Sequence, residues 1–185
     1  MLTGKKIVLG VSGGIAAYKM ANVASMLSKL HADIHVVMTE NATHFITPET
    51  FEVLTGNHCY TDTFDRCMEL HVPHIALGTQ ADAILIAPAS ADVVGKIANG
   101  IADDMLTTCV LPATCPVMLA PSMNVHMYEN PIVQDNMKKL ASYGYEIIEA
   151  DEGYLACRDI GKGKLPPEHV LVDYIIRACA MDKDL

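Results

Sequence analysis

The chain has 185 residues and a formal net charge of −9, with 51% hydrophobic and 19% charged residues. This size predicts one domain over residues 1–180, with a linker-like tail at 181–185. The acidic charge and the absence of Trp argue against nucleic-acid binding. With no long apolar run, no signal-peptide pattern and no CxxC pair, we expect a cytoplasmic protein that holds no metal.

Short apolar runs alternate with amphipathic stretches along the chain. A strand is predicted at 7–11, a helix at about 20–30, a strand at 34–38 and a helix at 48–55. Residues 56–73 are predicted to hold a short edge strand or a loop. A strand at 83–87, one or two helices within 91–110, a strand at 117–120, a helix at 131–143 and a strand at 146–148 follow. The glycine-rich, charged residues 150–167 are predicted to be a long loop before a last helix at 167–180.

This alternation predicts an α/β fold. Continuous apolar strands indicate a parallel sheet that is buried on both faces. We therefore expect a doubly wound sheet in three layers, with helices above and below it. The carboxyl ends of such strands form the edge where ligands bind.

Four predicted strands end in small or polar residues, at Ser12-Gly13-Gly14, at Thr39-Glu40-Asn41, at 88–92 and at 121–124. One such end is ordinary turn chemistry, but four at one edge favour a nucleotide-like cofactor. The Gly13-Gly14 turn precedes a helix and suits a phosphate. The turn departs from the GxGxxG fingerprint, which weakens the case for a dinucleotide. Glu40 could still hold the ribose of NAD, whereas the Thr39 hydroxyl suits a phosphate and favours FMN.

Four motifs resemble those of the flavin-containing cysteine decarboxylases, a family with a Rossmann-like flavoprotein fold. Residues 13–19 (GGIAAYK) resemble the phosphate-turn motif of that family, and residues 88–92 (PASAD) resemble its PASANT motif. Residues 121–128 (PSMNVHMY) resemble PxMNxxMW, and residues 155–163 (LACRDIGKG) resemble the substrate clamp ACGD-x-G-x-G. Asp92, Tyr128 and Arg158 depart from these patterns.

The resemblance implies FMN-dependent decarboxylation of 4′-phosphopantothenoylcysteine to 4′-phosphopantetheine, a step of coenzyme A biosynthesis. In that chemistry the flavin oxidises the substrate to a thioaldehyde, loss of CO2 gives an enethiolate, and the reduced flavin reduces it again. The resemblance also implies a homotrimer-based oligomer, commonly a dodecamer. It further implies a possible C-terminal fusion to phosphopantothenoylcysteine synthetase in a bifunctional protein.

The resemblance also assigns roles to individual residues. His74 would be the acid or base, Asn124 would bind a carboxylate or amide, and Cys157 would donate the proton of the reductive step. Cofactor contacts are expected from Ser12, Gly13, Gly14, Ile15, Thr39, Phe45, Ser90, Ala91, Asp92 and Ser122. Substrate contacts are expected from Asn124, Met127, Leu155, Ala156 and Lys162, and the nearby cations Arg158, Lys162 and Lys164 suit a substrate phosphate.

Structural explanations exist for the same residues, since His74 can be a loop histidine, Asn124 a helix N-cap and Cys157 a buried thiol. Two other functions also stay open. One is a peptidyl-cysteine decarboxylase that forms C-terminal aminoenethiols, and the other is a non-catalytic FMN-binding regulatory subunit. Cys157 favours complete decarboxylation, because the peptide-modifying relatives that stop before reduction lack it.

Overall fold

The computed structural model describes residues 1–64, 72–154, 156 and 159–180. Its strands are β1 (Lys6–Val11), β2 (Asp33–Met38), β3 (Cys59–Tyr60), β4 (Ala83–Ala89), β5 (Val117–Pro121), β6 (Glu146–Ile147), β7 (Asp151–Tyr154) and β8 (Ile160–Lys164). Its α-helices are α1 (Met20–Lys29), α2 (Pro48–Thr55), α3 (Pro73–Gln80), α4 (Ala91–Ala98), α5 (Met105–Val110), α6 (Val125–Tyr128), α7 (Pro131–Ser142) and α8 (Glu168–Ala180). Two 3-10 helices, η1 (Ile15–Lys19) and η2 (Glu40–His44), follow β1 and β2.

The central sheet has six strands in the order β3-β2-β1-β4-β5-β6, and all neighbouring pairs are parallel. The strand order reverses between β1 and β4, because β2 lies on one side of β1 and β4 on the other. In open α/β sheets a ligand binds at such a reversal, outside the carboxyl ends of the strands. The predicted parallel sheet is confirmed, and its order places the β1 and β4 ends side by side.

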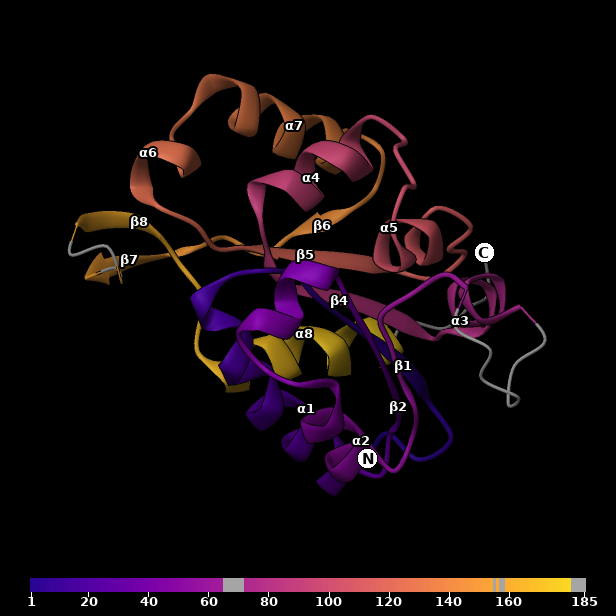
Figure 1. Ribbon diagram of the computed structural model, residues 1–185. Coiled ribbons are helices and arrows are strands. Elements are labelled where there is room, and N and C mark those ends of the chain that lie inside the picture. The colour runs from indigo at the N-terminus through magenta and orange to yellow at the C-terminus, as the bar shows by residue number, and fades with distance from the viewer. Residues whose placement is uncertain (65–71, 155, 157–158, 181–185) are drawn as a thin grey trace.

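Helices cover both faces of this sheet (Figure 1). Alternate residues of each strand point to opposite faces, so Ile7 and Leu9 pack with α1, α2 and α8, while Val8 packs with α3, α4, α5 and α7. Both hydrophobic clusters are almost fully buried. The predicted three-layer α/β architecture is therefore confirmed. None of the described helices is long and apolar enough to cross a membrane.

Local sequence signals explain several helix ends. Pro131 begins α7, where its missing N–H costs no hydrogen bond, and the Asn130 side chain accepts a hydrogen bond from Ile132 N at 2.9 Å. Asp104 and Thr107 form a reciprocal capping box at the start of α5. Thus residues 91–110 form two helices, one of the two arrangements that the sequence left open.

Two segments differ from the sequence-based expectations. Residues 59–60 form the expected edge strand, but the next described segment contains α3, which the sequence did not predict. Residues 150–167 are not a loop, because β7 and β8 form an antiparallel hairpin there. Most hairpin side chains are exposed, so the segment lacks the buried alternating face by which strands are recognised. Its glycines also lower its strand propensity.

Candidate functional site

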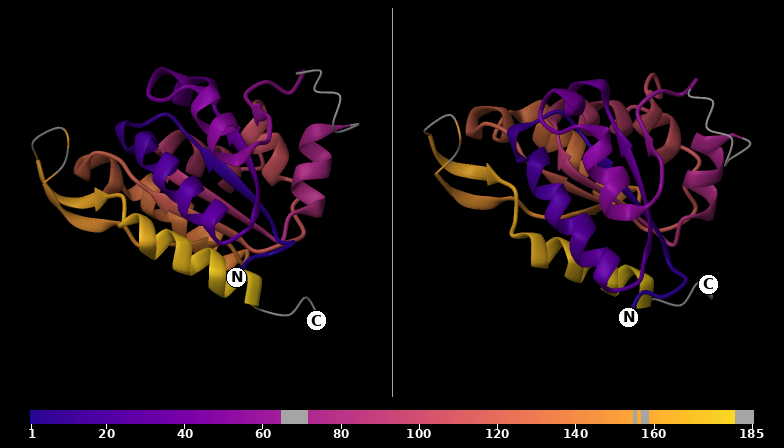
Figure 2. Two further views of the ribbon diagram at one scale, coloured as in Figure 1. Left: turned by 90° about the horizontal axis from the view of Figure 1, so that it is seen from below. Right: turned by 60° about the horizontal axis from the view of Figure 1, so that its bottom comes forward.

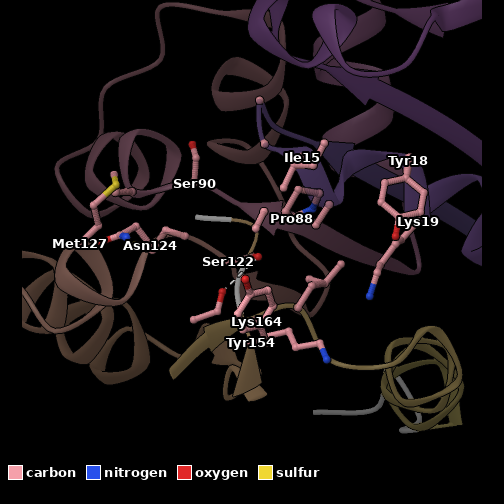
Figure 3. Close-up of a pocket in the computed structure, with 18 residues that line it drawn as sticks. Ile15, Tyr18, Lys19, Pro88, Ser90, Ser122, Asn124, Met127, Tyr154 and Lys164 are labelled. Atoms are coloured by element: carbon pink, nitrogen blue, oxygen red, sulfur yellow. Dashed lines mark hydrogen bonds between the residues drawn. The ribbon is translucent and has the colours of Figure 1, made fainter. Parts of the chain in front are cut away.

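A cavity of about 470 Å³ lies at the carboxyl ends of β1, β4 and β5 (Figure 3). Its walls come from the turn after β1, from η1, from the segments after β4 and β5, and from the β7–β8 hairpin. Its described lining residues are Gly13, Gly14, Ile15, Ala16, Tyr18, Lys19, Pro88, Ser90, Ala91, Ser122, Met123, Asn124, Met127, Tyr154, Ala156, Gly163, Lys164 and Leu165. The volume is in the range of small-molecule and cofactor sites.

The turn after β1 packs tightly against the segment after β2. A Cβ on Gly13 would lie 2.5 Å from Asn41 Cβ and 3.0 Å from the Asn41 carbonyl carbon, so no side chain fits there. Gly14 has more space, since a Cβ on it would meet Pro88 Cγ at 3.8 Å. Gly13, Gly14 and Ile15, which the sequence predicts as cofactor contacts, line the cavity.

Ser12 joins the β1 and β4 ends and does not line the cavity. Its hydroxyl donates to Pro88 O at 2.6 Å and accepts from Ser90 N at 2.9 Å, and the residue is fully buried. Ser90 itself caps α4, accepting a hydrogen bond from Val93 N at 3.3 Å. Ser90, Ala91 and Ser122 line the cavity. Ser12 therefore acts on the site by fixing two strand ends.

Three other expected cofactor residues are absent from the described lining. Thr39 is buried and caps η2 by accepting a hydrogen bond from Ala42 N at 3.3 Å, and Phe45 follows η2 with 46% of its surface exposed. Asp92 pairs with Lys96 at 3.3 Å. The Lys96 ammonium also contacts two further carboxylates, those of Asp103 at 3.1 Å and Asp104 at 3.4 Å. The hydrogen bond to Asp103 is the largest cause of a raised pKa at Lys96.

Asn124 caps α6, as one interpretation of the sequence had it, and it also lies at the cavity. Its side-chain oxygen accepts from His126 N at 2.8 Å and so caps α6, while its side-chain nitrogen donates to Asp159 Oδ2 at 2.9 Å. Asn124 and Met127 both line the cavity. The sequence analysis did not single out Asp159, although it belongs to the clamp motif.

The hairpin is held against the segment after β5. Gly163 O accepts hydrogen bonds from Met123 N at 3.0 Å and from Ser122 Oγ at 3.2 Å. A Cβ on Gly163 would lie 2.3 Å from Met123 O, and the φ of Gly163 is +138°. A Cβ on Gly161 would lie 2.6 Å from Val125 Cγ2. The two glycines therefore allow the hairpin to close over residues 122–125.

Of the substrate contacts expected from the hairpin, the structure places one in the cavity lining and one outside it. Ala156 lines the cavity, whereas Lys162 is absent from the described lining and pairs with Glu149. Leu155, Cys157 and Arg158 lie outside the described residues. Among the described cysteines, Cys59 and Cys109 are buried, which raises the pKa of each thiol to about 12. Neither lines the cavity, so neither replaces Cys157 as a candidate proton donor.

His74 lies in the first turn of α3, not in a loop, and it is not part of the cavity lining. Helix α3 and the hairpin lie at opposite ends of the molecule in both Figure 1 and Figure 2. The His74 Nδ1 atom is buried and has no hydrogen-bond partner among the described residues. One chain therefore does not bring His74 together with Asn124.

Several cavity residues were not predicted as contacts, among them Tyr18, Lys19, Tyr154 and Leu165. Tyr18 and Lys19 belong to the GGIAAYK motif, so the motif was the available signal. Within the described ranges, no three His, Cys, Asp or Glu side chains are grouped as metal ligands would be.

A family model described as Flavoprotein matches residues 1–180. The chain belongs to the Flavoprotein family. This confirms the expected family and a flavin cofactor. The cavity fits such a group, because Gly13 and Gly14 present only backbone to it and Ile15, Pro88 and Leu165 supply apolar surface for a planar ring.

Relatives of this flavoprotein chain include two curated bacterial proteins. The chain is 49% identical over 172 residues to the coenzyme A biosynthesis bifunctional protein CoaBC of Bacillus subtilis (strain 168), covering 92% of this chain and 42% of that protein. It is 42% identical to a probable phosphopantothenoylcysteine decarboxylase of Streptococcus mutans, covering 92% of this chain and 97% of that protein. The chain thus spans less than half of the bifunctional relative and nearly all of the shorter one.

A solved structure shares the fold. The FMN-dependent cysteine decarboxylase SpaF is 35% identical, with a TM-score of 0.83, covering 97% of this chain and all of that one. FMN is therefore the flavin named for a close structural neighbour.

Proposed function

We propose that this flavoprotein catalyses the FMN-dependent decarboxylation of 4′-phosphopantothenoylcysteine to 4′-phosphopantetheine in coenzyme A biosynthesis. The observation that carries the proposal is the cavity at the β1–β4 reversal, which residues of the β7–β8 hairpin line together with Asn124 and Met127. The names of the B. subtilis and S. mutans relatives support this activity, and SpaF supports FMN.

The reaction has no net oxidation or reduction. FMN, held by the turn after β1 and by the segments after β4 and β5, would supply reversible two-electron chemistry at the cysteinyl unit. The protein contributes binding and proton transfer. In the proposal the Asn124 carboxamide, oriented by its cap on α6 and by Asp159, binds the reacting carboxylate, and Met127 packs beside it. Cys157 donates the proton that completes the saturated product.

His74 requires a second chain in this proposal. Because His74 does not line the cavity of its own chain, we assign the acid–base role to His74 of a neighbouring copy in a homotrimer-based oligomer. A dodecamer would contain several such trimers. Fusion to a following synthetase is also part of the proposal, and the gene sequence beyond codon 185 tests it. A cytoplasmic location is proposed as well, and cell fractionation tests it.

The activity is tested with purified protein. We expect a bound flavin spectrum, release of CO2 and formation of 4′-phosphopantetheine, detected by mass spectrometry. The Cys157→Ser variant should release an oxidised enethiol product, whereas Cys179→Ser, a change on α8 outside the cavity, should keep the normal product. A cysteine-terminated peptide that loses CO2 in place of this substrate would indicate a peptidyl-cysteine decarboxylase. Bound FMN without turnover of either substrate would indicate a regulatory subunit.

A further inference from the structure

The Lys96 ammonium group gathers three carboxylates between two helices. It lies 3.3 Å from Asp92 Oδ2, 3.1 Å from Asp103 Oδ1 and 3.4 Å from Asp104 Oδ2. Asp92 belongs to the first turn of α4, whereas Asp103 and Asp104 precede the first residue of α5. The cluster therefore joins α4 to α5, and its three carboxylates and one ammonium group leave a formal charge of −2.

This cluster borders the flavin site without entering it. Ser90 and Ala91 line the cavity at the start of α4, and Asp92 comes next, with its Cα about 3.8 Å from that of Ala91. Even so, the lining that the structure describes contains no Asp or Glu. Lys96 lies about 6 Å further along the axis of α4 and pairs with Asp92 there. The ion pair therefore directs the Asp92 carboxylate toward the next turn of the helix and away from its cavity end.

Asp92 brings a negative charge to a position where the PASANT motif has a neutral Asn. The helix dipole favours a carboxylate in the first turn of α4, so nothing within that helix other than Lys96 draws the side chain from the cavity end. FMN carries a phosphate with close to two negative charges at neutral pH. A carboxylate beside the cavity repels such an anion, and the repulsion is stronger between low-dielectric walls than in water. The position of the Asp92 carboxylate therefore matters for the cofactor.

We propose that Lys96 is a positioning residue for the flavin site. Its ammonium group holds the Asp92 carboxylate outside the cavity and offsets part of the negative charge there, and FMN binds more tightly as a result. Helix α5 anchors the lysine in turn, because Asp104 Oδ1 accepts a hydrogen bond from Thr107 N at 2.8 Å while its Oδ2 contacts Lys96. This role concerns the cofactor, so it is the same for any substrate of the enzyme.

The Lys96→Met variant tests the proposal, because Met keeps much of the side-chain volume and removes the charge. The readout is the dissociation constant of FMN, obtained from the fluorescence of flavin released when the holoprotein is diluted, so no turnover is needed. In about 0.1 M salt we expect this constant to rise roughly five- to tenfold. In about 1 M salt, which screens charges beyond about 3 Å, the rise should fall below about twofold. Lys138→Met, a change in an exposed pair with Asp135 on α7, should bind FMN like the wild type.

Two double variants separate the position of the carboxylate from the net charge of the cluster. Adding either Asp92→Asn or Asp103→Asn to Lys96→Met returns the formal charge to −2, and the two side chains are similarly exposed, at 63% and 58%. No residue of the described segment 99–110, which contains Asp103, lines the cavity.

We expect Asp92→Asn to restore the FMN affinity to within about twofold of wild type and Asp103→Asn to leave most of the loss. Equal recovery in the two double variants would overturn the proposal, as would wild-type affinity in Lys96→Met. A loss that persists at high salt would also overturn it, because damage to the fold, unlike a charge effect, is not screened. The two double variants carry the same charge, so their comparison does not depend on the stability of Lys96→Met itself.

Discussion

Asn124 shows how one side chain can support both a helix and a cavity. Its oxygen caps α6 through His126 N, and its nitrogen reaches Asp159 across to the hairpin. The two bonds distinguish the ends of the carboxamide and so fix its orientation. Sequence analysis predicted the cap and the ligand-binding role as coexisting possibilities. It did not predict Asp159, because the partner lies 35 residues away.

Replacing Asp159 should therefore impair turnover without removing the site. For Asp159→Ala we expect kcat to fall roughly tenfold, which corresponds to about 1.4 kcal/mol, close to one hydrogen bond made to a charged group. Asp159→Asn retains an acceptor oxygen and should recover most of the activity. Steady-state kinetics and FMN content measure the effect, and a wild-type kcat in the Ala variant would contradict it.

At the scale of elements, periodicity identified the buried sheet and failed for the exposed hairpin. The apolar runs of β1, β4 and β5 are buried on both faces, so their sequences carry a strong signal. The β7–β8 hairpin is held by main-chain contacts at Gly163 and close packing at Gly161, which depend on the tertiary structure. Helix α3 buries Leu77 and Gly78, and Pro73 at its start was a helix signal that the sequence analysis did not use.

The Gly163→Ala variant tests how the hairpin is held. Its Cβ would meet Met123 O, and its positive φ disfavours any side chain, a strain of roughly 1–3 kcal/mol. We expect faster protease cleavage within residues 151–164 and at least a tenfold loss of turnover, with a small change in Tm because the hairpin is largely exposed. Gly95→Ala on α4, whose Cβ would have only ordinary contact with Asn136, should keep activity and leave Tm unchanged or raise it.

The edge of the sheet contains a carboxylate whose ionisation favours folding. Burial alone raises the pKa of Asp33, but the hydrogen bond from Asn57 and the nearby His35 outweigh it and hold the pKa below its usual 3.8. Asn57 donates to Asp33 Oδ1 at 2.9 Å and to Ile34 O at 2.8 Å, which secures the two-residue strand β3 beside β2. The stabilisation is thus present above pH 3.8 and is lost as the pH falls through the folded pKa.

Asp33→Asn should lower the free energy of unfolding at pH 7 by less than about 1 kcal/mol, because this partly exposed group is screened by solvent. The difference from wild type should shrink as the pH falls below 3.8. Urea unfolding at both pH values measures it. Asp135→Asn, which breaks an exposed pair with Lys138, should leave stability nearly unchanged at pH 7. An equal effect in the two variants would show that Asp33 has no special role.

For the whole molecule, the order of the sheet brings residues of distant segments to one edge, and this much could be predicted. Gly13, Ser90, Ser122 and Asn124 line one cavity as expected from their places after β1, β4 and β5. The separation of His74 from that cavity could not be predicted, since it depends on where α3 packs. No alternation of apolar residues encodes that placement.

Mixing two inactive variants tests whether neighbouring copies share a site. Asn124→Ala removes the cavity residue and His74→Asn removes the proposed contribution from another copy, so each pure variant should be inactive. When the two are refolded or expressed together, some mixed oligomers contain a cavity with both residues intact. We expect a fraction of wild-type activity, roughly a quarter of the sites if copies mix at random. The control is a chain that carries both changes and is taken through the same procedure by itself. This double variant should stay inactive.

The hydrogen bond from Ser12 to Pro88 O spans 76 positions of the chain and has a consequence for folding. The floor of the cavity cannot form until β4 has reached β1, after β2, α2 and α3 have been synthesised. Closing such a long segment costs conformational entropy before its contacts can compensate. During synthesis, one edge of β1 therefore stays unpaired until β4 has been made, and the unfinished chain exposes an open strand edge and apolar surface that favour aggregation.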